Sequence, residues 1–134
     1  ALIVLAAQPE PFDVCEVHFS GGQSIQNVQL AQSFKQIRRG LSGRDDIGAG
    51  MLFVWDRAEQ RAFWMRDTRV PLSVGFFDQD GSLFALEDMQ PETDTEHRSG
   101  RPAKFALELA QGDFARKGLV IGDRLIDRDC RPAN

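Results

Sequence analysis

The feature that most constrains the fold is a series of short segments rich in apolar residues, several of which begin after glycine or proline or end before aspartate. Four such runs of five to eight residues follow one another between Met51 and Met89. Runs of this length are typical of strands rather than helices. We therefore predict two hairpins, which pair Met51–Trp55 with Arg61–Met65 and Leu72–Phe77 with Ser82–Met89. The turn Asp78-Gln79-Asp80-Gly81 favours the second hairpin, because Gly81 can adopt a positive φ.

Further strands are predicted on both sides of these hairpins. Phe12–Phe19 and Ser24–Leu30 contain β-favouring residues and are separated by Ser20-Gly21-Gly22-Gln23, which is a turn signal. Ala103–Leu109 alternates between apolar and polar residues, and Leu119–Ile126 is expected to close the sheet.

Short helical segments interrupt the predicted strands. In Ala31–Leu41, the apolar residues Phe34, Ile37 and Leu41 recur at the spacing of one helical face. Gly112–Lys117 is predicted to form a single helical turn. The pattern as a whole predicts a mainly β fold, namely a single-domain β-sandwich or jelly-roll-like barrel with one or two short helices.

The length of 134 residues is that of one domain. We assign residues 12–134 to a single β-rich domain and residues 1–11 to a signal-peptide remnant or linker. The apolar run Ala1–Ala7 ends in small residues, like the tail of a secretory signal. An ordinary edge strand is the alternative interpretation of this run.

The two cysteines, Cys15 and Cys130, lie near opposite ends of the chain. A disulfide between them would tie the ends of the domain together and would require an oxidising compartment. The alternative is two unrelated buried thiols. With the N-terminal run, the cysteines predict an exported protein, periplasmic or extracellular.

The charge balance excludes some partners. A net charge of −4 and a pI near 5.1 disfavour a general nucleic-acid binder, which needs a basic face for phosphates. No apolar run approaches the 18 residues of a membrane-spanning helix. We expect no transmembrane segment, no cofactor and no metal, and the oligomeric state is left open.

Several short motifs follow one another along the chain. They are Gly40–Arg44, Gly50–Val54, Phe63–Thr68 with Pro71-Leu72, Asp80-Gly81, Met89 with Pro91, Leu107–Leu109 with Gly112, and Gly118-Leu119 with Gly122-Asp123. In this order they resemble the domain of unknown function 192 family over about Ser24 to Ile126. The resemblance implies a compact, mostly β fold of jelly-roll or sandwich type, often on exported bacterial proteins. It implies no established activity, although sugar binding has been suggested.

One position departs from the family pattern. Members commonly carry Asn where this chain has Asp67. An amide both donates and accepts hydrogen bonds, whereas a carboxylate only accepts them. A role that needs a donor at this position is therefore not expected here.

The stretch Phe63–Thr68 supplies the candidate binding site. Carbohydrate sites combine an aromatic face with polar groups, and this stretch offers both. The candidate ligand-binding residues are Trp64, Arg66, Asp67 and Thr68, with Arg39, Arg44 and Glu108 as further contributors. The Gln90–Pro102 loop is a candidate rim. The alternative is that Trp64 and Met65 are core residues and that Arg66 pairs with Asp67 to hold the turn.

Other reactive side chains point to weaker hypotheses. His97, with Asp94 and Ser99 nearby, lies in a polar segment and is interpreted as a solvated loop residue. Converging thioethers of Met51, Met65 and Met89 could bind Cu(I), although core packing is the usual role of methionine. No residue is assigned as catalytic.

Three functions remain open at this point. The first is non-catalytic binding of a small polar ligand such as a saccharide. The second is a hydrolase whose acid and base residues converge only in the fold. The third is a structural or interaction module. The absence of a recognisable catalytic motif favours a protein that is not an enzyme.

Overall fold

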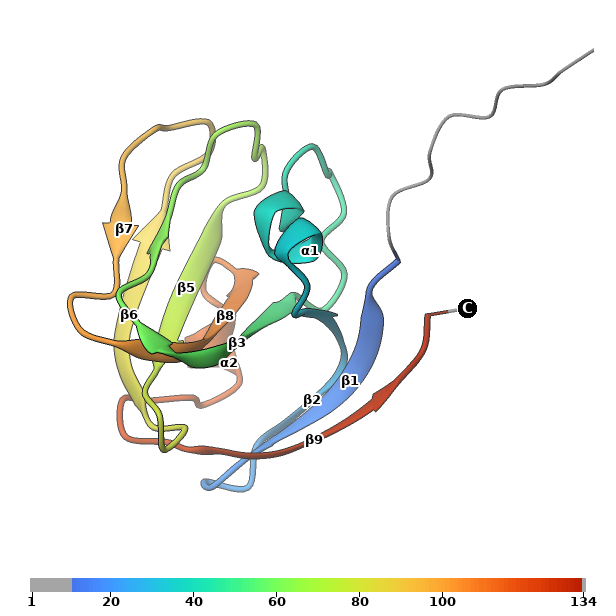
Figure 1. Cartoon of the computed structure of the whole chain (residues 1–134), viewed down its shortest axis with the longest axis vertical. Helices are drawn as coiled ribbons and strands as arrows, with labels where there is room; N and C mark the ends of the chain where they lie inside the picture. The colour runs from blue at the N-terminus through green and yellow to red at the C-terminus, as the bar shows by residue number, and fades with distance from the viewer. Residues whose placement is uncertain (1–10, 134) are drawn as a thin grey trace, which may run out of the picture.

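The computed structural model describes residues 11–133, and its main feature is one strongly curved sheet (Figure 1). The seven strands of this sheet are β1 (Asp13–Phe19), β2 (Ser24–Ala31), β3 (Met51–Glu59), β5 (Leu72–Phe77), β6 (Leu83–Met89), β8 (Ala103–Ala110) and β9 (Leu125–Arg131). A separate two-stranded ribbon consists of β4 (Ala62–Phe63) and β7 (His97–Arg98). The helices are α1 (Phe34–Arg39) and α2 (Asp113–Arg116).

The strands of the large sheet lie in the order β6-β5-β8-β3-β2-β1-β9. All neighbours are antiparallel except β2 and β3, which are parallel. A parallel pair needs a crossover connection, and here residues 32–50 provide it and carry α1. The mainly β, single-domain architecture predicted from the sequence is therefore confirmed.

The sheet is not closed, but its two edge strands approach each other at one end. Ser82, before β6, forms an isolated β-bridge with Arg124, before β9. The backbone N–H of Leu125 donates to the carbonyl of Gly81 at 2.8 Å. A Cβ at Gly81 would lie 2.7 Å from the Leu125 carbonyl oxygen, so this contact requires glycine. The curvature thus stops just short of a barrel.

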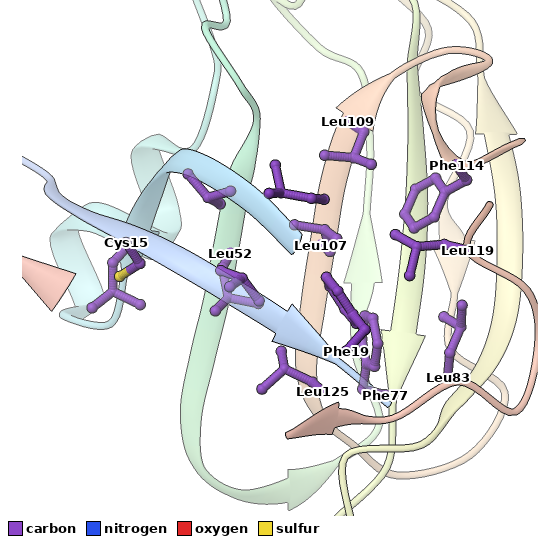
Figure 2. Packing of buried hydrophobic residues seen from close by; sticks show 14 residues of the cluster. Cys15, Phe19, Leu52, Phe77, Leu83, Leu107, Leu109, Phe114, Leu119 and Leu125 are labelled. Atoms are coloured by element: carbon purple, nitrogen blue, oxygen red, sulfur yellow. The ribbon is translucent and has the colours of Figure 1, made fainter. Parts of the chain in front are cut away.

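The inner face of the curved sheet holds one hydrophobic core (Figure 2). Phe19 of β1 and Phe77 of β5, which belong to non-adjacent strands, approach across it with ring centroids 6.2 Å apart. Leu107 and Leu109 of β8 point into the same cluster, and α2 contributes Phe114. Alternate residues of the central strands therefore face inward.

A second core covers the opposite face of the central strands. Met51 and Phe53 of β3, Val74 and Phe76 of β5, and Ala106 of β8 belong to this cluster. Leu41, which follows α1, and Met65, which follows β4, pack against them. Because both faces are covered at Met51–Phe53 of β3, throughout β5 and at Ala106–Leu109 of β8, a polar side chain at these positions would be buried.

The first predicted hairpin is wrong. Met51–Val54 of β3 pair with β8 and not with Arg61–Met65. Both edges of β3 are already occupied, since β2 lies on one side and β8 on the other. The segment after β3 therefore leaves the sheet, and Ala62 and Phe63 pair with Arg98 and His97 of β7. The second hairpin, β5 with β6, is confirmed.

The predicted apolar face of α1 is only partly correct. Phe34 is 78% exposed, whereas Gln36 is buried. Ser33 and Gln36 form a capping box at the start of the helix, and the Gln36 amide donates to the Pro11 carbonyl at 3.0 Å. These hydrogen bonds fix the rotation of the helix and leave Phe34 outside. The last strand also begins later than predicted, at Leu125 instead of Leu119.

The predicted disulfide is present between Cys15 and Cys130. These residues are direct partners across β1 and β9, so the bond joins the edge strand to its neighbour. The predicted signal-peptide remnant falls on residues 1–10, outside the described residues, apart from Pro11. In the described part of the chain, no helix is long and apolar enough to cross a membrane.

Candidate functional site

A pocket of about 360 Å³ opens on the second, outer face of the sheet. The end of α1 and the residues just after it form one side, and the β3–β4 turn with the start of the Phe63–Thr68 stretch forms the other. The lining residues are Ile37, Arg38, Arg39, Gly40, Leu41, Ser42, Phe53, Trp55, Gln60, Arg61, Ala62, Phe63, Trp64, Thr68, Leu72 and Glu108. Most of them are apolar or cationic.

Glu108 is the single carboxylate among these described lining residues. It lies in the middle of β8, directly between Met51 of β3 and Val74 of β5, both of which are fully buried. Leu107 and Leu109 face the inner core, so strand alternation turns Glu108 to the outer face. Gly50, before β3, allows a close approach here, because a Cβ would collide with the Glu108 carbonyl oxygen.

The carboxyl group of Glu108 is buried without a protein partner. Glu108 is 4% exposed, and within residues 11–133 its side chain makes no hydrogen bond or ion pair. The other buried polar residues of this part all have partners: Gln36, Thr68, Ser73 and Ser99. Burial raises the pKa of Glu108 to about 8, so the carboxyl group is mostly protonated at neutral pH.

Aromatic rings form one wall of the pocket. Phe53 and Phe63 meet edge to face with centroids 4.9 Å apart, and Trp55 lies 6.1 Å from Phe53. The guanidinium of Arg61 stacks over Trp55 at 4.2 Å, and its Nε donates to the Ala103 carbonyl at 3.2 Å. Partial burial lowers the pKa of Arg61, which nevertheless stays charged at neutral pH.

Trp64, which is 47% exposed, lies at the mouth of the pocket. Arg66 stacks over the Trp64 ring at 3.7 Å, and its Nε donates to Asp94 at 3.0 Å. This hydrogen bond lowers the pKa of the Asp94 carboxyl group. Arg66 and Asp94 therefore support the ring and hold it at the opening.

Two further cations stand at the rim. Arg38 and Arg39 end α1 and are exposed. The guanidinium of Arg39 lies 5.6 Å from the Phe12 ring centroid. The pocket therefore has an acid at its floor, aromatic rings along its wall and cations around its opening.

The profile of the uncharacterised family DUF192 (uncharacterized ACR) matches residues 16–126. The chain belongs to the DUF192 family. This match confirms the resemblance noted in the sequence and covers most of the domain. No curated protein matches the chain significantly.

Solved structures resemble this DUF192 domain over nearly its full length. A protein from Sinorhizobium meliloti 1021, for which a role as a transcription regulator has been suggested, is 26% identical and has a TM-score of 0.76, covering 90% of this chain and 96% of its own. A protein of unknown function from Novosphingobium aromaticivorans is also 26% identical with a TM-score of 0.76, covering 91% and 94%. A hypothetical protein from Synechocystis, 12% identical with a TM-score of 0.54, shares the fold over 90% of this chain and 19% of its own.

The DUF192 domain brings together four of the seven candidate residues named from the sequence. Trp64, Thr68, Arg39 and Glu108 line the pocket. Arg66 does not line it but stacks on Trp64. Arg44 lies elsewhere, where it donates to Gln29 at 2.5 Å and to the Asp46 carbonyl.

Asp67 has a backbone role in this domain. Its φ is +55°, in the left-handed region that Asn and Asp tolerate better than most residues. Its carbonyl accepts a hydrogen bond from the Gly43 N–H at 2.7 Å, which joins the motif to the loop after α1. The backbone conformation thus accounts for both Asn and Asp at this position.

The alternative reading of the motif is correct for Met65 and wrong for its neighbours. Met65 is fully buried, whereas Trp64 is half exposed. Arg66 pairs with Asp94 and not with Asp67. The Gln90–Pro102 loop does not line the pocket but supports the motif, since the Met65 N–H donates to the Thr93 carbonyl at 3.1 Å.

Sequence reasoning missed the aromatic wall, which includes Trp55 and Phe63. The sequence predicts both as strand residues of a local hairpin. It also missed Arg38 and Arg61, which lie at the rim and wall. The one available signal was the density of aromatic and arginine residues on both sides of the β3–β4 turn.

The interpretation of His97 as a solvated loop residue is wrong. His97 lies in β7 with its side chain 12% exposed, and its Nδ1 is 3.5 Å from Glu87. Met51, Met65 and Met89 are fully buried in the outer core. Their apolar surroundings match ordinary core packing.

Proposed function

We propose that this protein binds a small polar ligand of saccharide size in the Glu108 pocket without altering it chemically. The observation that carries the proposal is the buried carboxyl group of Glu108, which faces the pocket without a protein partner. Burying a polar group without a hydrogen bond costs about 1–3 kcal/mol. A ligand that bonds to Glu108 would recover this cost.

The remaining lining residues suit the same kind of ligand. Trp64, Trp55 and Phe63 line the pocket with aromatic surface against which sugar C–H groups can pack. Arg38 and Arg39 offer hydrogen-bond donors at the opening. A pocket that combines apolar walls with a few convergent polar groups is the usual form of a small-molecule site.

Simple binding is favoured over hydrolysis because the described pocket lining contains one carboxylate. A glycosidase positions two carboxyl groups across its substrate, and the lining here includes Glu108 without a second acid or a histidine. Glu87 and Asp88 lie on β6 and do not line the pocket. The proposal is therefore a binding protein and not an enzyme.

We also propose that the protein works outside the cytoplasm. The disulfide between Cys15 and Cys130 supports this location, because such bonds persist in oxidising compartments. A role in transcription has been suggested for the Sinorhizobium relative, and we do not propose it for this chain. The net charge of −4 does not favour contact with nucleic acid here.

A glycan array probed with the purified protein tests the proposal. We expect binding to at least one saccharide class, with loss of at least tenfold in affinity in Trp64→Ala. Phe34→Ala is the matched control, because Phe34 is also an exposed aromatic but does not line the pocket. A blank array together with a blank thermal-shift screen of polar metabolites would contradict the proposal.

A further inference from the structure

The surroundings of Glu108 indicate which chemical group a ligand would place against it. On its own sheet the carboxyl group is flanked by Met51 and Val74, which offer neither charge nor hydrogen-bond donors. The described side chains leave its oxygens without an N–H or O–H partner. No described residue therefore supplies a charge or a hydrogen-bond donor to an ionised Glu108, and a ligand in the pocket would supply one.

The charged groups that face the pocket are three arginines. Arg61 is held on the β3–β4 turn by Trp55, by the Ala103 carbonyl and by Glu59 at 3.6 Å. Arg38 and Arg39 stand at the exposed end of α1. None of them forms an ion pair with Glu108 in the described structure. The remaining lining residues, from α1 and the segment after it, β3, the β3–β4 turn, β4, β5 and the Phe63–Thr68 stretch, carry no acidic, basic or histidine side chain.

We infer that the ligand presents a protonated nitrogen, as an amine, amidine or guanidinium, to the carboxyl group of Glu108, with its polar remainder toward Arg38 and Arg39. This inference rests on the proposed binding function. A cationic nitrogen supplies both the opposite charge and the N–H donors that the protein lacks at this point. In a desolvated site such a charge-assisted pair is stronger than a neutral hydrogen bond.

The polarity of the pocket agrees with this orientation. Glu108 is buried at the floor, whereas Arg38 and Arg39 are exposed at the rim. A ligand in the reverse orientation would place its cation beside the guanidinium groups of Arg38 and Arg39, and its neutral end against an acid that has no partner in the described protein. Phe63, whose ring is not covered by a described arginine, also attracts cations through its π face.

Matched pairs of compounds test the inference, because each pair keeps its shape and changes its charge. Suitable pairs are glucosamine with glucose, arginine with citrulline, and benzamidine with benzamide. Binding is followed by NMR through the indole N–H signals of Trp55 and Trp64. We expect at least one cationic member to bind tenfold or more tightly than its neutral partner at pH 7.5. In Glu108→Gln this preference should fall below twofold.

Proton linkage provides a second readout that needs no variant. The cation selects the ionised form of Glu108, which is the minor form at neutral pH, so binding should release a proton. Affinity for the cationic member should therefore rise about tenfold from pH 6 to pH 7. Asp129→Asn, on the exposed strand β9, is the control and should keep both the preference and the pH dependence.

The outcomes separate this inference from the proposed function. Neutral members that bind as tightly as cationic ones, or binding that is independent of pH, would overturn the cationic ligand and leave the binding function standing. A positive glycan array without binding by any cationic compound of the panel would also overturn the cationic ligand and leave the binding function standing. A failure of both the array and the panel would overturn both proposals.

Discussion

We expect the position of Glu108 to lower the stability of the fold, because burial penalises its charged form. An apolar residue of similar size between Met51 and Val74 would complete the outer core without a desolvation cost. Sites that bind ligands commonly retain such unfavourable groups, since stability and function make different demands. The cost should be measurable through the pH dependence of unfolding.

We expect Glu108 to make the protein less stable as pH rises. Its pKa is raised from 4.5 to about 8 on folding, so the folded state holds the proton more tightly than the unfolded chain. The resulting stability is fully present below pH 4.5 and is lost as pH rises through 8. The slope attributable to this group approaches about 1.4 kcal/mol per pH unit within that window.

Urea unfolding at pH 5.5, 7.0 and 8.5 checks this expectation. Glu108→Gln should remove the slope and should be more stable than the parent protein at pH 8.5, because it keeps the shape without a charge. Asp129→Asn should retain the parent slope. Equal slopes in Glu108→Gln and the parent would contradict the buried, unpartnered state of Glu108.

Asp67 should tolerate Asn but not Ala. At a φ of +55°, Asp67→Asn should change the free energy of unfolding by less than about 0.5 kcal/mol, whereas Asp67→Ala should cost about 1 kcal/mol. Chemical denaturation of the two variants measures the difference. If Asn destabilised the protein as much as Ala, the carboxylate and not the backbone would be important at this position.

Residue types in the sequence were sufficient to predict part of the site. Trp64 and Thr68 were named for their chemistry, and Glu108 was named as a further contributor. The direction of Arg66 could not be predicted, because it depends on Asp94 in a loop that only the tertiary structure brings near. Residue types can suggest a site, but contacts between segments that are distant in sequence determine which residues belong to it.

The element that sequence reasoning placed wrongly is β4. A local hairpin with β3 was the simplest expectation, because closing a short loop costs little entropy. Pairing of Ala62 with Arg98 instead depends on β8 having already taken the edge of β3. The β5–β6 hairpin was predicted correctly because Gly81 encodes its turn locally.

Removal of the disulfide should loosen β9 without affecting the pocket. The bond joins residues 115 positions apart, and a disulfide that closes a loop of that length contributes about 2–5 kcal/mol to the free energy of unfolding. The double variant Cys15→Ala/Cys130→Ala should therefore lose stability in that range, and hydrogen exchange should show the largest loss of protection in β9. The indole signals of Trp55 and Trp64 should not shift. A loss of ligand binding at temperatures where the variant is folded would contradict this separation.

At the scale of the whole molecule, the two cores share the same central strands. Leu52 and Leu107 face the inner core, whereas Phe53 and Ala106, their chain neighbours, face the outer one. Neither core can be lost while the other persists, so the domain should unfold as one cooperative unit.

Comparison of two spectroscopic probes checks this cooperativity. Trp55 and Trp64 both lie on the outer side, so their fluorescence reports that face, while far-UV circular dichroism reports the whole sheet. We expect the two denaturation curves to share one midpoint. Separate midpoints would show that the outer face unfolds on its own.

The near-closure of the sheet at Gly81 and Leu125 also affects how the protein behaves at high concentration. Past this contact, β6 and β9 diverge as the two edge strands of the sheet, and such edges are templates for strand addition between molecules. Both edges carry exposed charges, with Glu87 and Asp88 on β6 and Asp127, Arg128 and Asp129 on β9. Desolvating these charges would make edge-to-edge stacking costly. We therefore expect the open edges of the sheet to resist strand addition between molecules.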